Sequence, residues 1–260
     1  MKKPHFILAL ALTMSATACL KTHNEPSSVL VSTLAGSETY GSADGTGSSA
    51  SFHRPRGIAV DRWGYVYVAD SGNGLIRKIS PGGVVKTFAG SSDGFADGTG
   101  TSAKFSLPLD VATDAAGNVY VADNYNKRIR KISPEGVVTT LAGSGALGSA
   151  NGPALSASFA WPHGVATDKS GNVYVADTNN SLIRKIGQDG TVTTFASTGT
   201  NGDTDGPAAT ASFYYPTHLV VDAANNIYIS DDGNNRIRKI SAEGIVSTFA
   251  GSGARGSIRR

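Results

Sequence analysis

Cysteine is almost absent from this sequence, which has one, Cys19, among 260 residues. A single cysteine cannot form an intramolecular disulfide, so the folded part must rely on a hydrophobic core. Long apolar runs are lacking too: the run from Phe6 to Met14 is about half of the ~20 residues that a membrane-spanning helix needs. These absences exclude a disulfide-stabilised scaffold and argue against a transmembrane helix as the anchor.

A strong excess of charge of either sign is also missing. The chain has 23 lysines and arginines against 20 acidic residues, and without residues 1–18 the basic count falls to 21. No clustered basic face of the kind that nucleic-acid binding needs is present, so we expect no nucleic-acid partner. No stretch of the repeats described below shows the i, i+3, i+4, i+7 pattern of a long amphipathic helix, and no GxSxG nucleophile motif occurs.

The N-terminus has the features of an export signal. A basic start is followed by the apolar run and then by the small residues Ala16, Thr17 and Ala18 before Cys19. The ATAC tetrad resembles a lipobox, with Ala16 where leucine is commoner, and this resemblance to bacterial lipoproteins implies that Cys19 is lipidated. The alternative is an ordinary cleaved signal. We therefore predict a lipoprotein signal peptide over 1–18, a polar lipidated tether over 19–28, and a location in the cell envelope, lipid-anchored and extracytoplasmic, facing the periplasm or on the surface.

Internal repetition dominates the rest of the chain. Four segments align without gaps from Phe52, Phe105, Phe159 and Phe213, with spacings of 53, 54 and 54 residues. Each contains four short runs rich in Val, Ile, Thr and Tyr, such as GVATD, NVYVAD, LIRKI and VTTFA. Glycine, asparagine, aspartate and proline separate the runs. Four strands per repeat is the strand count of a propeller blade, so the repeats predict an all-β fold.

The connections between these runs also repeat. DRWG, DAAG, DKSG and DAAN join the first two runs, and their last residue is suited to the positive φ of a tight hairpin. Longer connections, such as ADGTGSSASF, hold an aspartate or asparagine at one position, namely Asp44, Asp97, Asn151 and Asp205. A calcium loop would need 6 to 8 oxygen ligands, so we favour an Asx turn and one helical turn, with the phenylalanine filling the gap between blades.

The pattern PxGxAxD followed by GNVYVADxxNxxIRKI resembles NHL repeats, in register over all four copies. The resemblance implies a β-propeller of four-stranded antiparallel blades around a central channel, with domain bounds 29–251 and a polar tail over 252–260. A catalytic group is needed only once, so a tyrosine, an aspartate and an arginine that recur in every copy are expected to be structural, the tyrosines between blades and the Asp and Arg tying hairpins together. They are Tyr67, Tyr120, Tyr174 and Tyr228; Asp70, Asp123, Asp177 and Asp231; and Arg77, Arg130, Arg184 and Arg238.

One strand is surplus in this count. VLVSTLAG, residues 29–36, matches a fourth strand, although the last copy already has its own in VSTFAG. The chain is therefore predicted to form four NHL repeats plus one extra N-terminal strand, as a closed four-bladed ring, an incomplete arc or a truncated product. Open blade edges favour self-association.

Function is expected where the copies differ, at the start of the first strand and in the loop after the second. These positions should form a polar rim with aromatic plates near one mouth of the channel, suited to a glycan, peptide or protein ligand; an ordinary wet loop surface is the alternative. The candidate ligand-binding residues are Arg54, Arg56, Asp110, Tyr125, Trp161, His163, Tyr215 and His218.

A metal-dependent enzyme is the alternative function. The resemblance to the peptidyl-hydroxyglycine lyases, NHL enzymes with zinc-binding histidines directly after the first-strand proline, implies such a role for His163 alone, since Arg56, Leu109 and Thr217 fill the other blades. If the pleat is regular, His218 points to the other side of its strand. A site of His163, His218 and Asp110 in a propeller lyase or lactonase is conceivable, but we assign no catalytic residue, metal ligand or cofactor.

Overall fold

The computed structural model describes residues 30–254, and from Thr33 onward these residues form one compact unit. The predicted signal peptide, Cys19, the tether over 19–28 and residues 255–260 of the tail lie outside the described residues. Over 30–254 the regular structure consists of strands and 3-10 helices of three residues, with no α-helix. No helix among these residues is long and apolar enough to cross a membrane.

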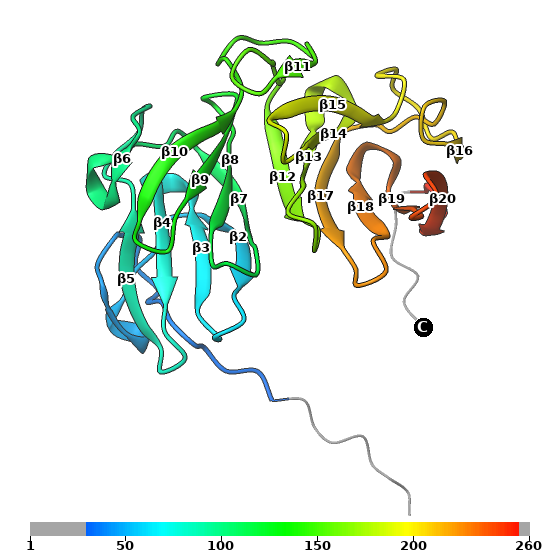
Figure 1. Cartoon of the computed structure of the whole chain (residues 1–260). Helices are drawn as coiled ribbons and strands as arrows, with labels where there is room; N and C mark the ends of the chain where they lie inside the picture. The colour runs from blue at the N-terminus through cyan, green and yellow to red at the C-terminus, as the bar shows by residue number, and fades with distance from the viewer. Residues whose placement is uncertain (1–29, 255–260) are drawn as a thin grey trace, which may run out of the picture. The chain divides into compact units, whose positions relative to one another are not determined.

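The repeats fold into four sheets, which we call blades 1 to 4 (Figure 1). Blade 1 contains β1 (Gly45–Thr46), η1 (Gly47–Ser49), β2 (Pro55–Val60), β3 (Val66–Asp70), η2 (Ser71–Asn73), β4 (Leu75–Ile79) and β5 (Val84–Ala89). Blade 2 contains β6 (Gly98–Thr99), η3 (Gly100–Ser102), β7 (Pro108–Thr113), β8 (Val119–Asp123), β9 (Arg128–Ile132) and β10 (Val137–Ala142). Blade 3 contains β11 (Gly152–Pro153), β12 (Pro162–Thr167), β13 (Val173–Asp177), η4 (Thr178–Asn180), β14 (Leu182–Ile186) and β15 (Thr191–Ala196). Blade 4 contains β16 (Gly206–Pro207), β17 (Pro216–Val221), β18 (Ile227–Asp231), η5 (Asp232–Asn234), β19 (Arg236–Ile240) and β20 (Ile245–Ala250).

Every blade is an antiparallel sheet with one topology, β1-β5-β4-β3-β2 in blade 1 and its equivalents elsewhere. The four long strands are those expected from the repeats. The fifth strand is an addition of two residues, because the Asp-Gly segment of the longer connection folds back onto the outer edge of the fourth long strand, as Gly45 does opposite Val85. The propeller fold is confirmed, and its blades are one short strand wider than the sequence indicated.

The hairpin turns follow the predicted chemistry. The residue expected to take a positive φ does so in every blade, at Gly64, Gly117, Gly171 and Asn225, with φ between 63° and 86°. The aspartate that begins each turn binds the backbone across it: Asp114 accepts the N–H groups of Ala116 and Asn118, each at 2.9 Å. The turn is thus closed by side-chain and backbone chemistry that is local in sequence.

A buried arginine ties each blade together. In blade 2, Arg130 donates to the Asp123 carboxylate at 2.8 Å, to Asp97 at 2.6 Å and to the Lys104 carbonyl at 3.0 Å. The other oxygen of Asp123 accepts the N–H of Ser106 at 2.8 Å. The Asp–Arg tie predicted from the sequence is confirmed. A third residue also takes part, which the sequence predicted only as the start of an Asx turn. The arginine of each blade donates to it, at Asp44, Asp97, Asn151 and Asp205.

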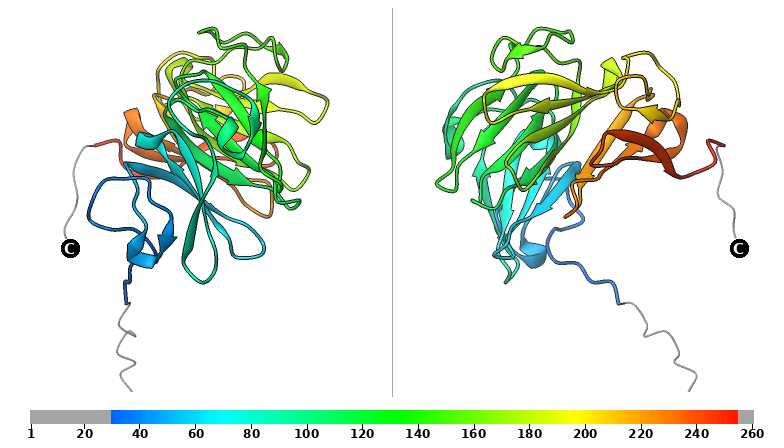
Figure 2. Two further views of the ribbon diagram at one scale, coloured as in Figure 1. Left: turned by 90° about the vertical axis from the view of Figure 1, so that its left-hand side faces the viewer. Right: turned by 45° about the vertical axis from the view of Figure 1, so that its right-hand side comes forward.

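Successive blades pack through three apolar clusters of the same design. Between blades 2 and 3, Tyr120, Ile129 and Ala142 pack against Phe159 and Val175. The equivalent tyrosines and phenylalanines fill the other two interfaces, so both residue types lie between blades as expected. The blades follow one another in chain order about one axis, from β1–β5 to β16–β20 (Figure 2).

The two end faces of this unit are not packed on each other. Ile58 and Val60 on blade 1 and Val220 and Phe249 on blade 4 are exposed, although their counterparts inside the propeller are buried or half-buried. This exposure supports the incomplete arc among the alternatives left open by the sequence.

The extra N-terminal strand is a correction, because residues 30–36 form no strand. A fourth strand of a blade pairs with the third strand of its own sheet, and residues 30–36 have no such partner. Gly36 alone is placed like the residue after a fourth strand. Its N–H donates to the Gly47 carbonyl at 3.0 Å, as that of Gly90 donates to the Gly100 carbonyl at 3.1 Å.

Candidate functional site

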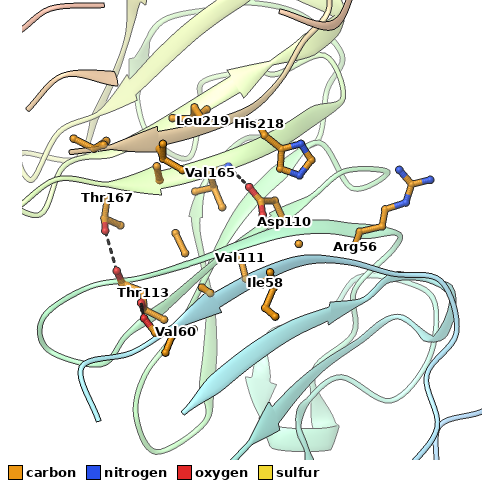
Figure 3. Close-up of a pocket in the computed structure, with 16 residues that line it drawn as sticks. Arg56, Ile58, Val60, Asp110, Val111, Thr113, Val165, Thr167, His218 and Leu219 are labelled. Carbon is orange, nitrogen blue, oxygen red and sulfur yellow. Dashed lines mark hydrogen bonds between the residues drawn. The ribbon is translucent and has the colours of Figure 1, made fainter. Parts of the chain in front are cut away.

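The first long strands of the four blades, β2, β7, β12 and β17, line a cavity of about 490 Å³ on the propeller axis. Arg56, Asp110 and His218 lie at one end of it, and Thr113 and Thr167 lie toward the other (Figure 3). Valine, isoleucine, leucine and alanine side chains line the length between. The cavity is therefore apolar along its walls, with charged and imidazole groups concentrated at one mouth.

A β-bulge at the start of each first strand shapes this mouth. In blade 3 the pairing register shifts between Pro162 and Gly164, and in blade 4 it shifts between Pro216 and Leu219. An extra residue at this point turns the following side chains away from regular alternation.

The bulges correct the expected orientation of His218. With a regular pleat, His163 and His218 would point to opposite sides, but their rings meet edge to face with centroids 5.3 Å apart. The physical reason is the register shift, which falls on both histidine positions. Sequence alternation alone therefore assigned His218 to the wrong side of its strand.

His163 is a half-buried imidazole with an unpartnered nitrogen. Its Nδ1 is buried and has no hydrogen-bond partner within the described structure. Burial, followed by the positive charges at His218 and Arg56, lowers its pKa to about 4, although the Asp232 carboxylate and the Thr217 backbone act in the opposite direction. His163 is therefore neutral at physiological pH, with one buried nitrogen that lacks a hydrogen bond.

Asp110 connects blade 2 to blade 3. Its side chain is buried and accepts the N–H of Val165 at 3.0 Å. Burial raises its pKa to about 6, partly offset by that hydrogen bond and by the His218 charge. The aligned residue of blade 1 is Gly57, where an added Cβ would collide with the Asp110 backbone. Glycine at that position is explained by the close approach of the two strands.

The aromatic rim lies just outside this mouth. Trp161 and Tyr125 meet edge to face with centroids 5.7 Å apart, and both are exposed. Trp161 has φ of +60°, and the residue before the first-strand proline is left-handed in all four blades. Such backbone costs ~1–2 kcal/mol for a residue other than glycine. The left-handed backbone at Trp161 is stabilised because the preceding residue, Ala160, donates its N–H to Asp177 at 2.7 Å. Asp177 is itself paired with the buried Arg184.

The remaining candidates are divided between regions. Tyr215 lies beside Tyr214, with ring centroids 4.8 Å apart, on the blade 4 side of the rim. Arg54 lines a separate pocket with Tyr40 and Phe52. The structure thus brings together Arg56, Asp110, His163 and His218, places Trp161 with Tyr125, and leaves Arg54 apart.

Two threonines that line the cavity were not predicted from the sequence. Thr113 donates to the Val60 carbonyl at 3.1 Å, and Thr167 donates to the Thr113 carbonyl at 3.0 Å. These bonds join neighbouring first strands at the mouth opposite the histidines. The repeated VATD motif was the available signal, since its threonine occupies one position in two adjacent copies.

The conceivable metal site is not formed. Over residues 30–254, no group of three or more His, Cys, Asp or Glu side chains is placed to hold a metal ion. His163 and His218 do meet, but the Asp110 carboxylate is directed at the Val165 N–H.

Comparisons with known proteins match the repeats directly. The NHL repeat family matches residues 105–132 and 159–186, and the Teneurin NHL domain family matches residues 34–100. This chain is an NHL-repeat β-propeller. Human NHL repeat-containing protein 2 is 36% identical over 151 residues, which are 52% of this chain and 21% of that protein. Human Teneurin-1 is 28% identical over 228 residues, covering 76% of this chain and 8% of that protein. The region that matches this chain is thus less than a quarter of the length of these relatives.

Solved structures share the fold of this NHL propeller at lower identity. An auxiliary nutrient binding protein from Bacteroides thetaiotaomicron has a TM-score of 0.59 at 19% identity, covering 78% of this chain and 49% of that chain. A streptogramin B lyase has a TM-score of 0.53 at 18% identity, covering 76% and 55%. Binding proteins and enzymes therefore both occur among propellers of this shape, so the function of this chain must be argued from its own residues.

Proposed function

We propose that this chain is an extracytoplasmic, membrane-anchored binding module that recognises a glycan at the mouth of its propeller. The observation that carries the proposal is the convergence of residues that differ between copies: Trp161 meets Tyr125 while His163 meets His218. An exposed aromatic pair offers an apolar face to a sugar ring. Arg56 and His218 line the mouth and offer polar groups to its hydroxyls.

The fold supports a binding role. Shared structural duties are carried by residues that recur in every blade, so Trp161 and His163 are free of them. Two of the structurally similar propellers, from Bacteroides thetaiotaomicron and Bacteroides ovatus, are described as auxiliary nutrient binding proteins. Peptide or protein ligands are the other outcomes of the binding test.

The test is a thermal-shift screen of the full chain against glycans, peptides and divalent metals. A ligand that binds only the folded chain raises the melting temperature, by an amount equivalent to about 2.7 kcal/mol at 100 times Kd. Trp161→Ala and His163→Ala should abolish the rise. Trp63→Ala is the matched control, because Trp63 is an exposed tryptophan at the β2–β3 turn, the other end of the first strand. Equal loss in Trp63→Ala would contradict the site.

Membrane anchoring is tested separately. Cys19→Ala should move the protein from the membrane fraction to the soluble fraction if Cys19 carries the lipid. An unchanged fractionation would remove the anchor from the proposal and leave the binding site standing.

A propeller lyase or lactonase using His163 and His218 is the second candidate. The meeting of the two rings beside Asp110, with its raised pKa, favours it, since perturbed groups gather at catalytic sites. If the chain turns over a lactone or a lyase substrate, and His218→Ala loses this activity, the enzyme candidate would replace simple binding.

A further inference from the structure

Every interface inside the propeller joins the same two surfaces. We call the face of a blade toward the next blade its trailing face; in blade 1 it carries Tyr67, Ala69, Ile76 and Ala89. We call the opposite face the leading face; in blade 2 it carries Phe105, Val111 and Val121. Both sets recur at equivalent positions in the other two interfaces. One pair of complementary apolar surfaces is therefore used three times.

Blade 4 has a trailing face with nothing packed on it in the described structure. Ile237 is 38% exposed, whereas its counterparts Ile76, Ile129 and Ile183 are 0% exposed. Phe249 is 62% exposed and meets the Tyr228 ring with centroids 5.1 Å apart. The face keeps the apolar residues Tyr228, Ile237 and Ala250, although Ser230 stands where the other blades have alanine.

The leading face of blade 1 is also largely exposed, although the N-terminal residue Ala35 packs on it. Ile58 is 64% exposed, whereas its counterparts Val111, Val165 and Leu219 are at most 3% exposed. The cluster on this face is the smallest of the four, with Val68, Ile79 and Val85 at its centre. Terminal repeats of an elongated array normally carry a polar outer face. Neither end of this propeller does.

We propose that a second copy of this chain covers these faces, the trailing face of blade 4 packing against the leading face of blade 1 of the other copy. The occupant is a second copy because three internal interfaces show which surface a trailing face fits, and this chain carries that surface on blade 1 with no other blade packed on it.

Charged residues at the two ends fit the same arrangement. Inside the propeller, Asn124 and Thr178 donate to the first-strand proline carbonyls of the next blade, at 3.0 and 2.7 Å. The equivalent residue of blade 4 is Asp232, which has no proton to donate. Its counterpart across the new interface is Pro55, which lies between Arg54 and Arg56. An ion pair thus replaces the hydrogen bond at this interface.

The N-terminal segment must move aside for this docking. The Gly36 N–H donates to the Gly47 carbonyl, and Ala35 packs on the leading face of blade 1. Gly251 of the second copy would take the place of Gly36. The two segments have similar sequences, TLAG over 33–36 and TFAG over 248–251. The leading face therefore already binds a segment of this type.

The expected assembly is a dimer. A head-to-tail interface closes into a ring when the rotations add to a full circle. The solved propellers that resemble this chain are matched over about half their length, for example 49% and 55%. Two copies joined in this way would place the sheets of both about one shared axis.

Sedimentation of the full chain in detergent tests the interface. Wild type should have twice the monomer mass, and Phe249→Lys should weaken association roughly tenfold or more, because it places a charge in a packed apolar contact. Val137→Lys is the control, since Val137 is an exposed valine on β10, away from both end faces. A wild-type monomer, or a Phe249→Lys dimer as tight as wild type, would overturn the proposal.

A disulfide test identifies the pairing. The hydrogen bond between Thr167 and the Thr113 backbone shows that residues at this position in neighbouring blades are close. In a Cys19→Ser background, Val60→Cys with Val221→Cys should give a covalently linked dimer under oxidation. Thr113→Cys with Thr167→Cys is the control, expected to link within one chain. A Val60–Val221 link within one chain would show a closed four-bladed ring and overturn the dimer.

Discussion

At the scale of single residues, the buried arginine is the centre of each blade. Its guanidinium holds two segments far apart in sequence and also lies over a phenylalanine, as Arg130 does over Phe105 at 5.1 Å. The Nε atom of each of the four arginines has no partner among the described residues. Burial of an ion pair is costly by itself, so the pair is best understood as fixing which segments meet.

Arg130→Ala should destabilise the propeller strongly. Arg130 and Asp123 are both fully buried, and removal of one partner leaves an uncompensated buried charge. We expect a loss of about 3–5 kcal/mol in the free energy of unfolding, measured by urea titration. Arg236→Ala is the control, because the Arg236–Asp203 pair is partly exposed and should contribute about 0–1 kcal/mol. Similar losses of unfolding free energy in both variants would contradict a special role of the buried Arg130–Asp123 pair.

The two titrating groups of the mouth should oppose each other between pH 4 and 6. The pKa of Asp110 is raised to about 6, so the folded chain binds more protons than the unfolded chain, and this contribution to stability falls as pH rises. The pKa of His163 is lowered to about 4, so the unfolded chain binds more protons, and this contribution rises with pH.

Variants should separate these two contributions. Relative to wild type, Asp110→Asn should shift the dependence of stability on pH across this window toward a rise, whereas His163→Gln should shift it toward a fall. The raised pKa of about 6 corresponds to about 3 kcal/mol for the buried Asp110, and the change for half-buried His163 should be smaller. Urea titrations at pH 4, 5 and 6 measure both slopes. Slopes that differ from the wild-type slope in the same direction, or not at all, would show that these residues do not contribute as described.

At the scale of elements, the sequence predicted what is local. Strand alternation and the DxxG turns need only neighbouring residues, and both were found as expected. The bulges were missed because they depend on the pairing of two strands, as in the shift between Pro216 and Leu219. The bond from Arg77 to Asp44 was missed because the two residues are 33 positions apart. Consequently the residues of the mouth were identified, but the meeting of His163 with His218 was not.

Gly64→Ala should test the turn without disturbing packing. Gly64 has φ of +81°, and an added Cβ would come no closer than 3.5 Å to Pro81. The cost should therefore come from the backbone, about 1–2 kcal/mol in the free energy of unfolding. Gly82→Ala is the control, because Gly82 lacks a positive φ and has open space around it. An unchanged stability in Gly64→Ala would mean that the turn relaxes to another type.

At the scale of the whole molecule, stability should vary along the chain. Each inner blade packs on two neighbours, whereas blades 1 and 4 pack on one, as their exposed faces show. In such arrays stability is close to a sum of repeat and interface contributions. The end blades therefore lack one interface contribution each.

Hydrogen exchange should reveal this gradient directly. In dilute solution, amides of β18 and β19 should exchange faster than those of β13 and β14, which have nearly the same sequence and pairing. Matched sequences make this comparison a measure of the interface alone. If two copies join through their end faces, the difference should shrink as protein concentration rises, because blade 4 then gains the missing neighbour. Uniform protection at every concentration would show instead that the four blades open as one cooperative unit.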